Sequence, residues 1–377
     1  MSAAILPFVH ARGSWGDIGY QIGQMTAPLI RRHIDAWLQH VIDSTGSSRD
    51  AAIAAAAPFA APIQAHAPFL WEELEGMTRG SDTPIAELLM LQARAEVMRA
   101  QQEALAPEAV LECTSFAVGA SRTAGESVFF GQNVDLVPFI EAFGVVIRQY
   151  PNDAPATLLY TSAGLLGHNG LNEAGVGVCA NFIDDPKGWR DGFPRYLLSR
   201  LALRQDTAET ALEAVFVPPR AASRNLLLAD VQGTLINAEL LIEEAGFLRA
   251  EDDVLVHANH LEADVFEGLE TPSENSLCRR QRLQALLDGA PSPLTVTDLQ
   301  HMYRDHANAP HSLCAHPYEG RNLQTVVSVI GNLTERKLYA AKGSPCRAPY
   351  ATYTLATCQQ GALSVQVEDT TFLGSAS

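Results

Sequence analysis

Cys113 is a candidate nucleophile because it opens a strand-like segment directly after a helical one, in the sequence ECTSF (residues 112–116). A thiol with a pKa of about 8.5 is only a few per cent thiolate at neutral pH, so it needs a base before it can attack a carbonyl carbon. An internal cysteine more often packs as a small hydrophobic side chain. The segments downstream of Cys113 decide between these two interpretations.

Three polar segments follow Cys113 and could supply its partners: GQNVD at residues 131–135, GLNEAG at residues 170–175, and HANH at residues 257–260. Carboxylate and amide side chains at strand ends can orient a nucleophile or donate to the charge that develops on an acyl oxygen. The chain has no H-E-x-x-H and no G-x-S-x-G, and its cysteines form no C-x-x-C pair. A zinc protease, an α/β-hydrolase and a Cys-rich zinc or redox site are therefore not indicated.

The predicted secondary structure that must position these segments changes from helices to mainly strands near residue 108. Upstream, apolar residues recur at helical spacing over residues 15–42, 51–60 and 84–105. Downstream, β-branched and aromatic residues predict strands at 113–118, 127–134, 145–150 and 157–162, and hairpins that turn at 173–175, at 232–233 and near Asn332. Helices are predicted at 196–203, at 208–215 and around Leu283 and Leu287. The pattern favours one α/β domain over residues 1–377, with helices outside antiparallel sheets.

Taken together, these segments resemble the acyl-coenzyme A:6-aminopenicillanate acyltransferase family (peptidase family C45), which belongs to the N-terminal nucleophile hydrolases. The family motifs C-T-[ST], G-Q-N-W-D, G-x-N-x-x-G and a late N-H are matched in order by CTSF, GQNVD, GLNEAGVGV and ANHL. The early GSWGDIGYQIG and the late TVVSVIGNLTERKLYAAKGSPC also resemble family segments. The resemblance implies an αββα sandwich of two stacked antiparallel sheets with a mostly helical N-terminal segment.

The resemblance also implies that the chain cuts itself before Cys113, leaving an α chain of residues 1–112 and a β chain of residues 113–377 that stay together. Cys113 would then carry a free α-amine, whose pKa of about 7.7–8.0 lets it take the thiol proton near neutral pH. The implied reaction hydrolyses or transfers an acyl group through a Cys113 thioester. The substrate would be an N-acyl amide or an acyl-coenzyme A, and no metal or organic cofactor is expected.

Four further residues match family positions. The resemblance implies that Asp135 orients the amine of the nucleophile and that Asn259 donates to the acyl oxygen. It also implies that Asn172 supplies a second donor and that Arg321 lies near the nucleophile. Each has an ordinary alternative: a strand-end aspartate, two turn asparagines and a surface arginine. Glu112 departs from the Gly or Asp that family members often have before the cysteine.

Composition limits the partners and the location of the protein. The chain of 377 residues is 47% hydrophobic and carries a net charge of −17, which indicates a globular protein and argues against nucleic acid or an anionic membrane. It shows no basic and apolar secretion signal and no apolar run of about 18 residues. We therefore expect a cytoplasmic protein with free thiols and no membrane partner. The run of residues 279–282 (RRQR) is predicted to be a solvated helix face.

Two alternatives remain open at this stage. The nearer one is an amidase of the bile-salt or penicillin V acylase type, or of the acid-ceramidase type, within the same superfamily. Those enzymes place an arginine where this chain has Gln132. The more distant alternative is a binding protein that keeps the sandwich without turnover.

Overall fold

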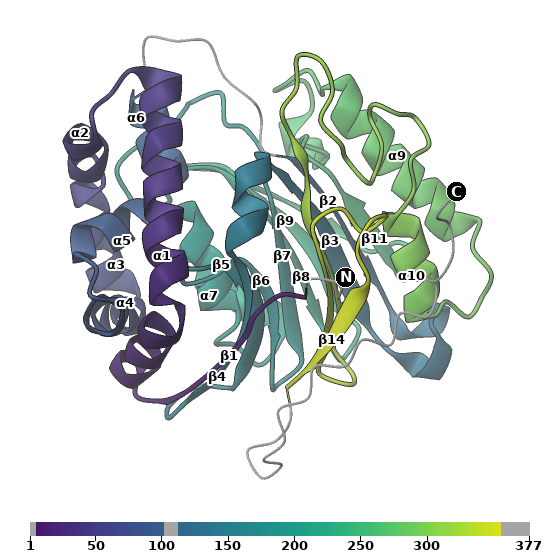
Figure 1. Ribbon diagram of the computed structural model, residues 1–377. Helices are drawn as coiled ribbons and strands as arrows, with labels where there is room; N and C mark the ends of the chain where they lie inside the picture. Colours follow the sequence, from purple (N-terminus) through teal and green to yellow (C-terminus); the bar gives the residue numbers. More distant parts are fainter. Residues whose placement is uncertain (1–4, 102–111, 356–377) are drawn as a thin grey trace.

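The computed structural model describes residues 5–101 and 112–355, and its elements stack in four layers: helices, an eight-stranded sheet, a six-stranded sheet, and helices again (Figure 1). The first layer contains α1 (Trp15–Thr45), α2 (Arg49–Ala54), α3 (Ala60–His66), α4 (Pro68–Ser81), α5 (Ile85–Gln92) and α6 (Arg94–Gln101). Two helices from later in the chain, α7 (Leu198–Ala202) and α8 (Ala208–Phe216), also pack on the eight-stranded sheet. The last layer contains α9 (Glu274–Asp288) and α10 (Val296–Tyr303).

The eight-stranded sheet has its strands in the order β1-β4-β5-β6-β7-β8-β9-β10. These strands are β1 (Phe8–Gly13), β4 (Gly144–Pro151), β5 (Thr157–Ser162), β6 (Asn169–Asn172), β7 (Val176–Asn181), β8 (Arg224–Asp230), β9 (Leu235–Leu240) and β10 (Ala245–Arg249). Successive strands from β4 to β10 pair antiparallel, whereas β1 pairs parallel with β4. The chain runs through a helical layer and two strands of the other sheet between β1 and β4, and such a long crossover allows a parallel pair.

The six-stranded sheet has the order β11-β2-β3-β12-β13-β14 and is antiparallel throughout. Its strands are β11 (Val254–His257), β2 (Glu112–Val118), β3 (Phe129–Leu136), β12 (Gln324–Asn332), β13 (Lys337–Lys342) and β14 (Tyr350–Thr354). Strand β2 lies between β3 and β11, although the chain passes through most of the eight-stranded sheet between β2 and β11. This order brings the GQNVD and HANH segments to either side of the strand that holds Cys113.

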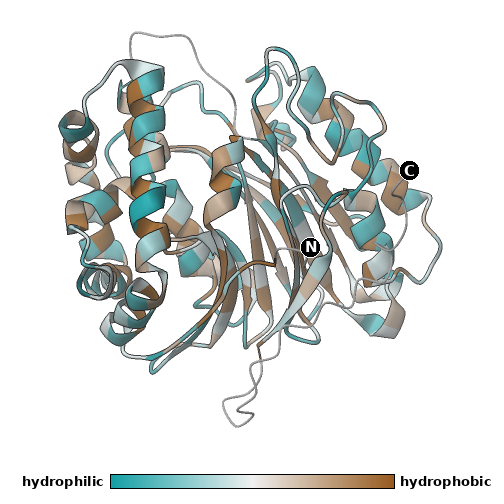
Figure 2. Cartoon of the chain, viewed as in Figure 1, coloured by the Kyte–Doolittle hydropathy of each residue, from teal (hydrophilic) through white to brown (hydrophobic). Residues whose placement is uncertain are grey.

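Close contacts occur both within the first helical layer and between the two sheets. Helix α1 begins at a capping box in which Ser14 and Asp17 exchange hydrogen bonds, and it packs on α4 so tightly that a Cβ on Gly19 would lie 1.8 Å from the carbonyl oxygen of Glu73. Between the sheets, the Phe130 ring of β3 lies over Gly177 of β7, where a Cβ would come within 2.6 Å of it. Figure 2 shows that the central strands are largely hydrophobic and that the outer helices carry much of the hydrophilic surface.

The predicted αββα sandwich with a helical N-terminal segment is confirmed. The predicted strands and hairpins are found within a few residues of their expected bounds, while the parallel β1–β4 pair corrects the expectation of purely antiparallel sheets. The predicted helix at 84–105 is divided into α5 and α6, and residues 102–105 lie outside the described residues. Within the described parts of the chain, every helix is too short or too polar to cross a bilayer.

Candidate active site

Cys113 is the second residue of β2 and is buried, with 3% of its surface exposed. Its backbone N–H donates to Oδ1 of Asn259 at 2.8 Å, and its carbonyl oxygen accepts from Nη1 of Arg279 at 2.7 Å. A second guanidinium nitrogen of Arg279 donates to the same Asn259 oxygen at 2.9 Å. The backbone of the candidate nucleophile is therefore fixed on both sides by side chains from two other parts of the chain.

Glu112, the residue before Cys113, is held by two arginines. Its carboxylate forms ion pairs with Arg321, which precedes β12, and with Arg279 of α9 at 3.3 Å. Glu112 also lies opposite Asp135 in the β2–β3 ladder. An arginine pair compensates a buried carboxylate that would otherwise be costly to desolvate. The peptide bond between Glu112 and Cys113 is thus anchored by ion pairs on one side and by hydrogen bonds on the other.

Asp135, near the end of β3, is fully buried, and one of its carboxylate oxygens accepts a hydrogen bond. Its Oδ1 accepts a hydrogen bond from the Thr325 hydroxyl at 2.6 Å, while its Oδ2 has no hydrogen-bond partner among the described residues. Burial raises the pKa of Asp135 to about 7, although the Arg279 charge and the Thr325 hydrogen bond oppose the shift. A buried carboxylate whose second oxygen has no hydrogen-bond partner can stabilise a positive charge that forms beside it.

Asn259 follows β11 and is positioned by hydrogen bonds to α9 and to the segment after β7. Its backbone N–H donates to the Ser276 hydroxyl of α9 at 2.8 Å, and its Nδ2 donates to the Phe182 carbonyl at 2.7 Å. Just upstream, His257 lies 2.8 Å from the Glu239 carboxylate, which also accepts backbone N–H groups from the loop after Asn259. These contacts fix the HANH segment against β2.

The Cys113 thiol is not a ready nucleophile in this environment. Burial raises its pKa to about 12, and the Asp135 charge adds to that effect, whereas the positive charges of Arg224 and Arg279 oppose it. A thiol of this kind is almost wholly protonated at neutral pH, so a base must be supplied before it can react. Among the described residues, no hydrogen bond joins the thiol to a histidine.

Comparison with known proteins places the chain in a family. The family model described as acyl-coenzyme A:6-aminopenicillanic acid acyl-transferase matches residues 122–347, which is more than half of the chain. The chain belongs to this family. The 40 kDa form of acyl-coenzyme A:6-aminopenicillanic-acid-acyltransferase from Emericella nidulans is 22% identical over 344 residues, covering 89% of this chain and 92% of that protein. The protein is therefore an acyltransferase or amide hydrolase with the N-terminal nucleophile hydrolase fold.

Solved structures give weaker matches to this acyltransferase-family chain. Penicillin V acylase from Agrobacterium tumefaciens is 13% identical with a TM-score of 0.42, covering 61% of this chain and 83% of its own. A mutant conjugated bile acid hydrolase from Clostridium perfringens is 12% identical with a TM-score of 0.47, covering 67% and 96%. The family match begins after Cys113, so it contains Asp135, Asn259 and Arg321 but not the candidate nucleophile itself.

A cluster of buried arginines surrounds the Tyr196 ring of this acyltransferase-family protein, and the charge of one of them, Arg224, opposes the burial that raises the pKa of the Cys113 thiol. The guanidinium groups of Arg94, Arg195 and Arg224 lie 3.6, 5.1 and 4.8 Å from the centre of the Tyr196 ring. All three side chains are at most 4% exposed, and within the described part of the chain none of them forms an ion pair with a carboxylate. The Nε atoms of Arg195 and Arg224 have no hydrogen-bond partner there either. This arrangement can accept an anion.

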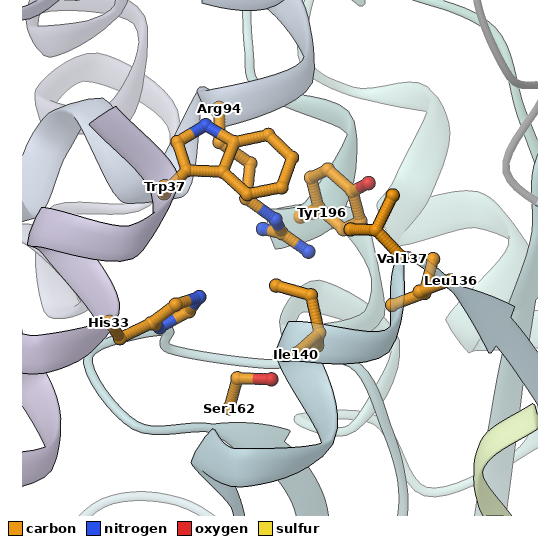
Figure 3. A pocket seen from close by; sticks show the side chains of 8 residues that line it. All are labelled: His33, Trp37, Arg94, Leu136, Val137, Ile140, Ser162 and Tyr196. Atoms are coloured by element: carbon orange, nitrogen blue, oxygen red, sulfur yellow. The ribbon is translucent and has the colours of Figure 1, made fainter. Parts of the chain in front are cut away.

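A narrow pocket lies between one arginine of this cluster, Arg94, and the end of β3. Figure 3 shows Arg94 at the top of the pocket and Tyr196, Val137 and Leu136 on its right, and the last two directly follow Asp135 in the sequence. Its remaining lining residues are His33, Trp37, Ile140 and Ser162. The pocket therefore offers mainly apolar walls and one guanidinium group, that of Arg94.

Gln132 belongs to a polar network between the two sheets. Its Nε2 donates to Asn181 Oδ1 at 3.0 Å, and its Oε1 accepts from Asn169 at 2.6 Å. Asn181 in turn donates to the carbonyl oxygens of Ala258 at 2.9 Å and Cys113 at 3.4 Å. Both ends of the Gln132 amide are used in these hydrogen bonds. Gln132 therefore supports the Cys113 backbone through Asn181, and it offers no positive charge to a substrate.

The structure brings four predicted residues to Cys113 and leaves one away from it. Glu112, Asp135, Asn259 and Arg321 all lie around β2, as described above. Asn172 does not join them, because its Nδ2 donates to the carbonyls of Leu203 and Gln205 and its Oδ1 accepts from Gly175 and Val176. The prediction that Asn172 is a second oxyanion donor is therefore replaced by a role in the β6–β7 turn.

Sequence reasoning missed Arg279, which was predicted to be part of a solvated helix face. That prediction is wrong, because Arg279 is fully buried and contacts both Cys113 and Glu112. A signal was present in the sequence: Arg279 lies four and eight residues before Leu283 and Leu287, which places it on the same buried face of α9. The Thr325 contact with Asp135 and the cluster around Arg224 had no comparable local signal.

Proposed function

We propose that this protein is a self-processing cysteine amidohydrolase or acyltransferase, in which cleavage before Cys113 creates the catalytic residue. The observation that carries the proposal is the double anchoring of the 112–113 peptide bond. Glu112 is paired with Arg321 and Arg279, and the N–H of Cys113 is bound by Asn259. Holding a reacting bond and its nucleophile in one geometry lowers the entropic part of the barrier.

The processing step consumes no separate base overall, because the thiol proton ends on the Cys113 nitrogen. The Cys113 sulfur attacks the Glu112 carbonyl carbon, the C–N bond breaks, and the Cys113 nitrogen takes up the thiol proton. This N→S acyl shift leaves a thioester between Glu112 and Cys113, which water hydrolyses to a Glu112 carboxylate and a free thiol. The products are an α chain of residues 1–112 and a β chain of residues 113–377. Arg279 and Arg321 stabilise the added negative charge at Glu112.

The new α-amine supplies the missing base for turnover. It forms at the nitrogen that already contacts Asn259, and Asp135 offers a vacant buried oxygen for its positive form. The amine takes the thiol proton, sulfur attacks the acyl carbon, and the ammonium returns the proton to the leaving amine. An amide nitrogen has two N–H groups and Phe182 takes one from Asn259, so we assign the other to the acyl oxygen. Water or a second amine then releases the acyl group from the thioester.

The arginine cluster favours substrates that carry an anionic group. Three buried positive charges meet at the Tyr196 ring, those of Arg94, Arg195 and Arg224. The charge of Arg224 also lowers the pKa of the Cys113 thiol, against the effect of burial. A carboxylate on an N-acyl amide would compensate the three charges. The donor can be such an amide or an acyl-coenzyme A, and the acceptor water or an amine.

Processing is tested by denaturing gel and intact mass. The gel should show two bands that divide the 40.6 kDa of the chain in proportion to the lengths of residues 1–112 and 113–377, and both pieces should elute together on a native column. The larger piece should begin at Cys113 with a free amine. Cys113→Ala should remain whole and inactive, whereas Cys278→Ser, which alters a half-buried thiol elsewhere, should be cut normally. Full amidase activity in an uncut wild-type chain would refute the proposal.

The substrate class is tested with matched pairs of N-acyl amines that differ only by one carboxylate. We expect the acidic member to react with the higher kcat/KM and to lose this advantage in Arg224→Met. Adding a free amine during turnover separates transfer from hydrolysis, because transfer yields the exchanged amide. Equal rates for the acidic and neutral members would refute the proposed preference for anionic substrates, but they would not contradict the proposed role of Cys113.

A further inference from the structure

We propose that His306, Cys314, His316 and Cys346 bind a zinc ion, because the fold brings two imidazoles and two thiols into one four-membered cluster. Their ligand atoms all lie within 4.8 Å of one another. His316 Nε2 lies 3.0 Å from His306 Nε2, 3.7 Å from Cys314 Sγ and 3.4 Å from Cys346 Sγ. This cluster is separate from the residues assigned to acyl transfer.

The spacing of the ligand atoms matches a tetrahedral zinc site. Zn–N bonds of about 2.0–2.1 Å and Zn–S bonds of about 2.3 Å at tetrahedral angles place N and N about 3.3 Å apart and N and S about 3.5 Å apart. The three distances from His316 Nε2 each lie within about 0.3 Å of these values. One ion can therefore reach all four ligand atoms with small side-chain adjustments.

The ligand set selects the metal. Two thiolates and two imidazoles are the ligands of structural zinc sites, and they are unsuited to magnesium or calcium, which take oxygen. Four protein ligands also leave no open position for a substrate, so this ion would be structural rather than catalytic. A Cys314–Cys346 disulfide would not use the two histidines, whose rings stack with their centres 5.2 Å apart, and both thiols are free in the structure.

The zinc would connect two loops that belong to different parts of the chain. His306, Cys314 and His316 lie between α10 and β12, and Cys346 lies between β13 and β14. The ligands lack the short C-x-x-C spacing by which a zinc site is recognised in a sequence, since two whole strands separate Cys346 from the other three. The sequence pattern therefore indicates no metal site, and only the tertiary structure brings the four ligands together.

The metal cluster is tied to the acyl-transfer site through Ala315, which lies between two of the ligands. Its N–H donates to the Thr325 hydroxyl at 2.9 Å, and its carbonyl accepts from the Thr325 N–H at 3.1 Å. The same hydroxyl donates to Asp135. The chain that leaves His316 then leads to Arg321, the partner of Glu112. A bound zinc would fix the segment that positions both charged residues.

Metal content of the full, untagged chain tests the proposal directly. Protein produced in zinc-supplemented medium should contain about one zinc per chain by elemental analysis. Cys346→Ser and the exposed His306→Ala should each lose most of it. His301→Ala, an exposed histidine on α10, should retain it. Cys278→Ser should also retain it, and because Cys278 forms a smaller group with Glu274 and His311, zinc loss in that variant alone would move the site there and overturn the proposal.

Cobalt substitution reports the ligands independently of activity. Co²⁺ in the wild-type protein should give the visible bands of a tetrahedral site together with a thiolate charge-transfer band, and Cys346→Ser should weaken the latter. Chelation should lower the melting temperature of wild-type protein but not of Cys346→Ser. The unprocessed Cys113→Ala chain should bind the same amount of zinc, so failure of the cleavage proposal would not affect this result. Metal-free wild-type protein, or a Cys314–Cys346 disulfide found by mass, would refute the zinc site.

Discussion

Replacing Asp135 by Asn in the uncut Cys113→Ala chain should stabilise the folded protein, although the same change should abolish activity in the processed enzyme. The uncut chain presents a neutral peptide nitrogen where the processed one presents an amine. Asp135 is then a fully buried carboxyl group with one vacant oxygen. Asparagine has the same shape, keeps the acceptor for Thr325 and removes the charge that burial disfavours.

The magnitude follows from the raised pKa of Asp135, about 7 in the folded protein against an ordinary value of 3.8. Folding favours the protonated carboxyl, so its contribution to stability is complete below about pH 3.8 and is lost as the pH rises through 7. At about 1.4 kcal/mol per pKa unit, the total is about 4 kcal/mol. Between pH 5 and pH 7.5, the stabilisation by Asp135→Asn should grow by about 2.5 kcal/mol.

Urea unfolding of Cys113→Ala with and without Asp135→Asn, at pH 5, 6, 7 and 8, measures this growth. The double variant should have the higher midpoint, and the gap should widen up to about pH 7 and then stay constant. Asp191→Asn, at an exposed aspartate, controls for the loss of one negative charge. A gap that does not change with pH, or a double variant that is less stable at pH 8, would refute the view that burial raises the pKa of Asp135 in the uncut chain.

Three further predictions concern the groups around Cys113. Cys113→Ser should be cut more slowly than wild type on a gel time course, because a hydroxyl is a poorer nucleophile than a thiolate. Arg279→Met should slow cleavage and destabilise the fold by about 3–5 kcal/mol, since it removes one partner of the buried Glu112, whereas Arg280→Met on the same helix should cost under about 1 kcal/mol. Equal urea midpoints for the two arginine variants would contradict the burial of Arg279. Arg224→Met should raise the pKa of the Cys113 thiol and slow its alkylation by iodoacetamide at pH 8, and an unchanged rate would show that Arg224 does not act on the thiol.

Local patterns predicted much of the fold because they reflect local physics. The apolar spacing of residues 15–42 corresponds to α1, and the turn signal at 173–175 corresponds to the β6–β7 hairpin. The same patterns did not predict β1, β10, β11 or β14, which are short strands that all lie at sheet edges. Pairing with a distant neighbour decides the structure of such strands more than composition does. The parallel pairing of β1 with β4 was likewise a property of the whole chain.

The sequence by itself determined the residue types of the candidate site and their order along the chain. CTSF, GQNVD and ANHL pointed to Cys113, Asp135 and Asn259 because these segments resemble the motifs of the family in type and in order. Only the tertiary structure decided which residues meet. It placed β11 beside β2, and so Asn259 on the Cys113 N–H, and it turned Arg279 inward.

The tertiary structure also separated residues that looked alike in sequence and joined others that did not. Asn172 and Asn259 both lie at strand ends, yet the Asn172 amide is used by its own turn and by the segment that follows α7. The ligands His306 and Cys346 lie far apart in the sequence and share no motif, yet their loops meet. Strand order and loop packing depend on contacts between distant residues, whereas motif and periodicity record only neighbours along the chain, and this is the physical reason for the difference.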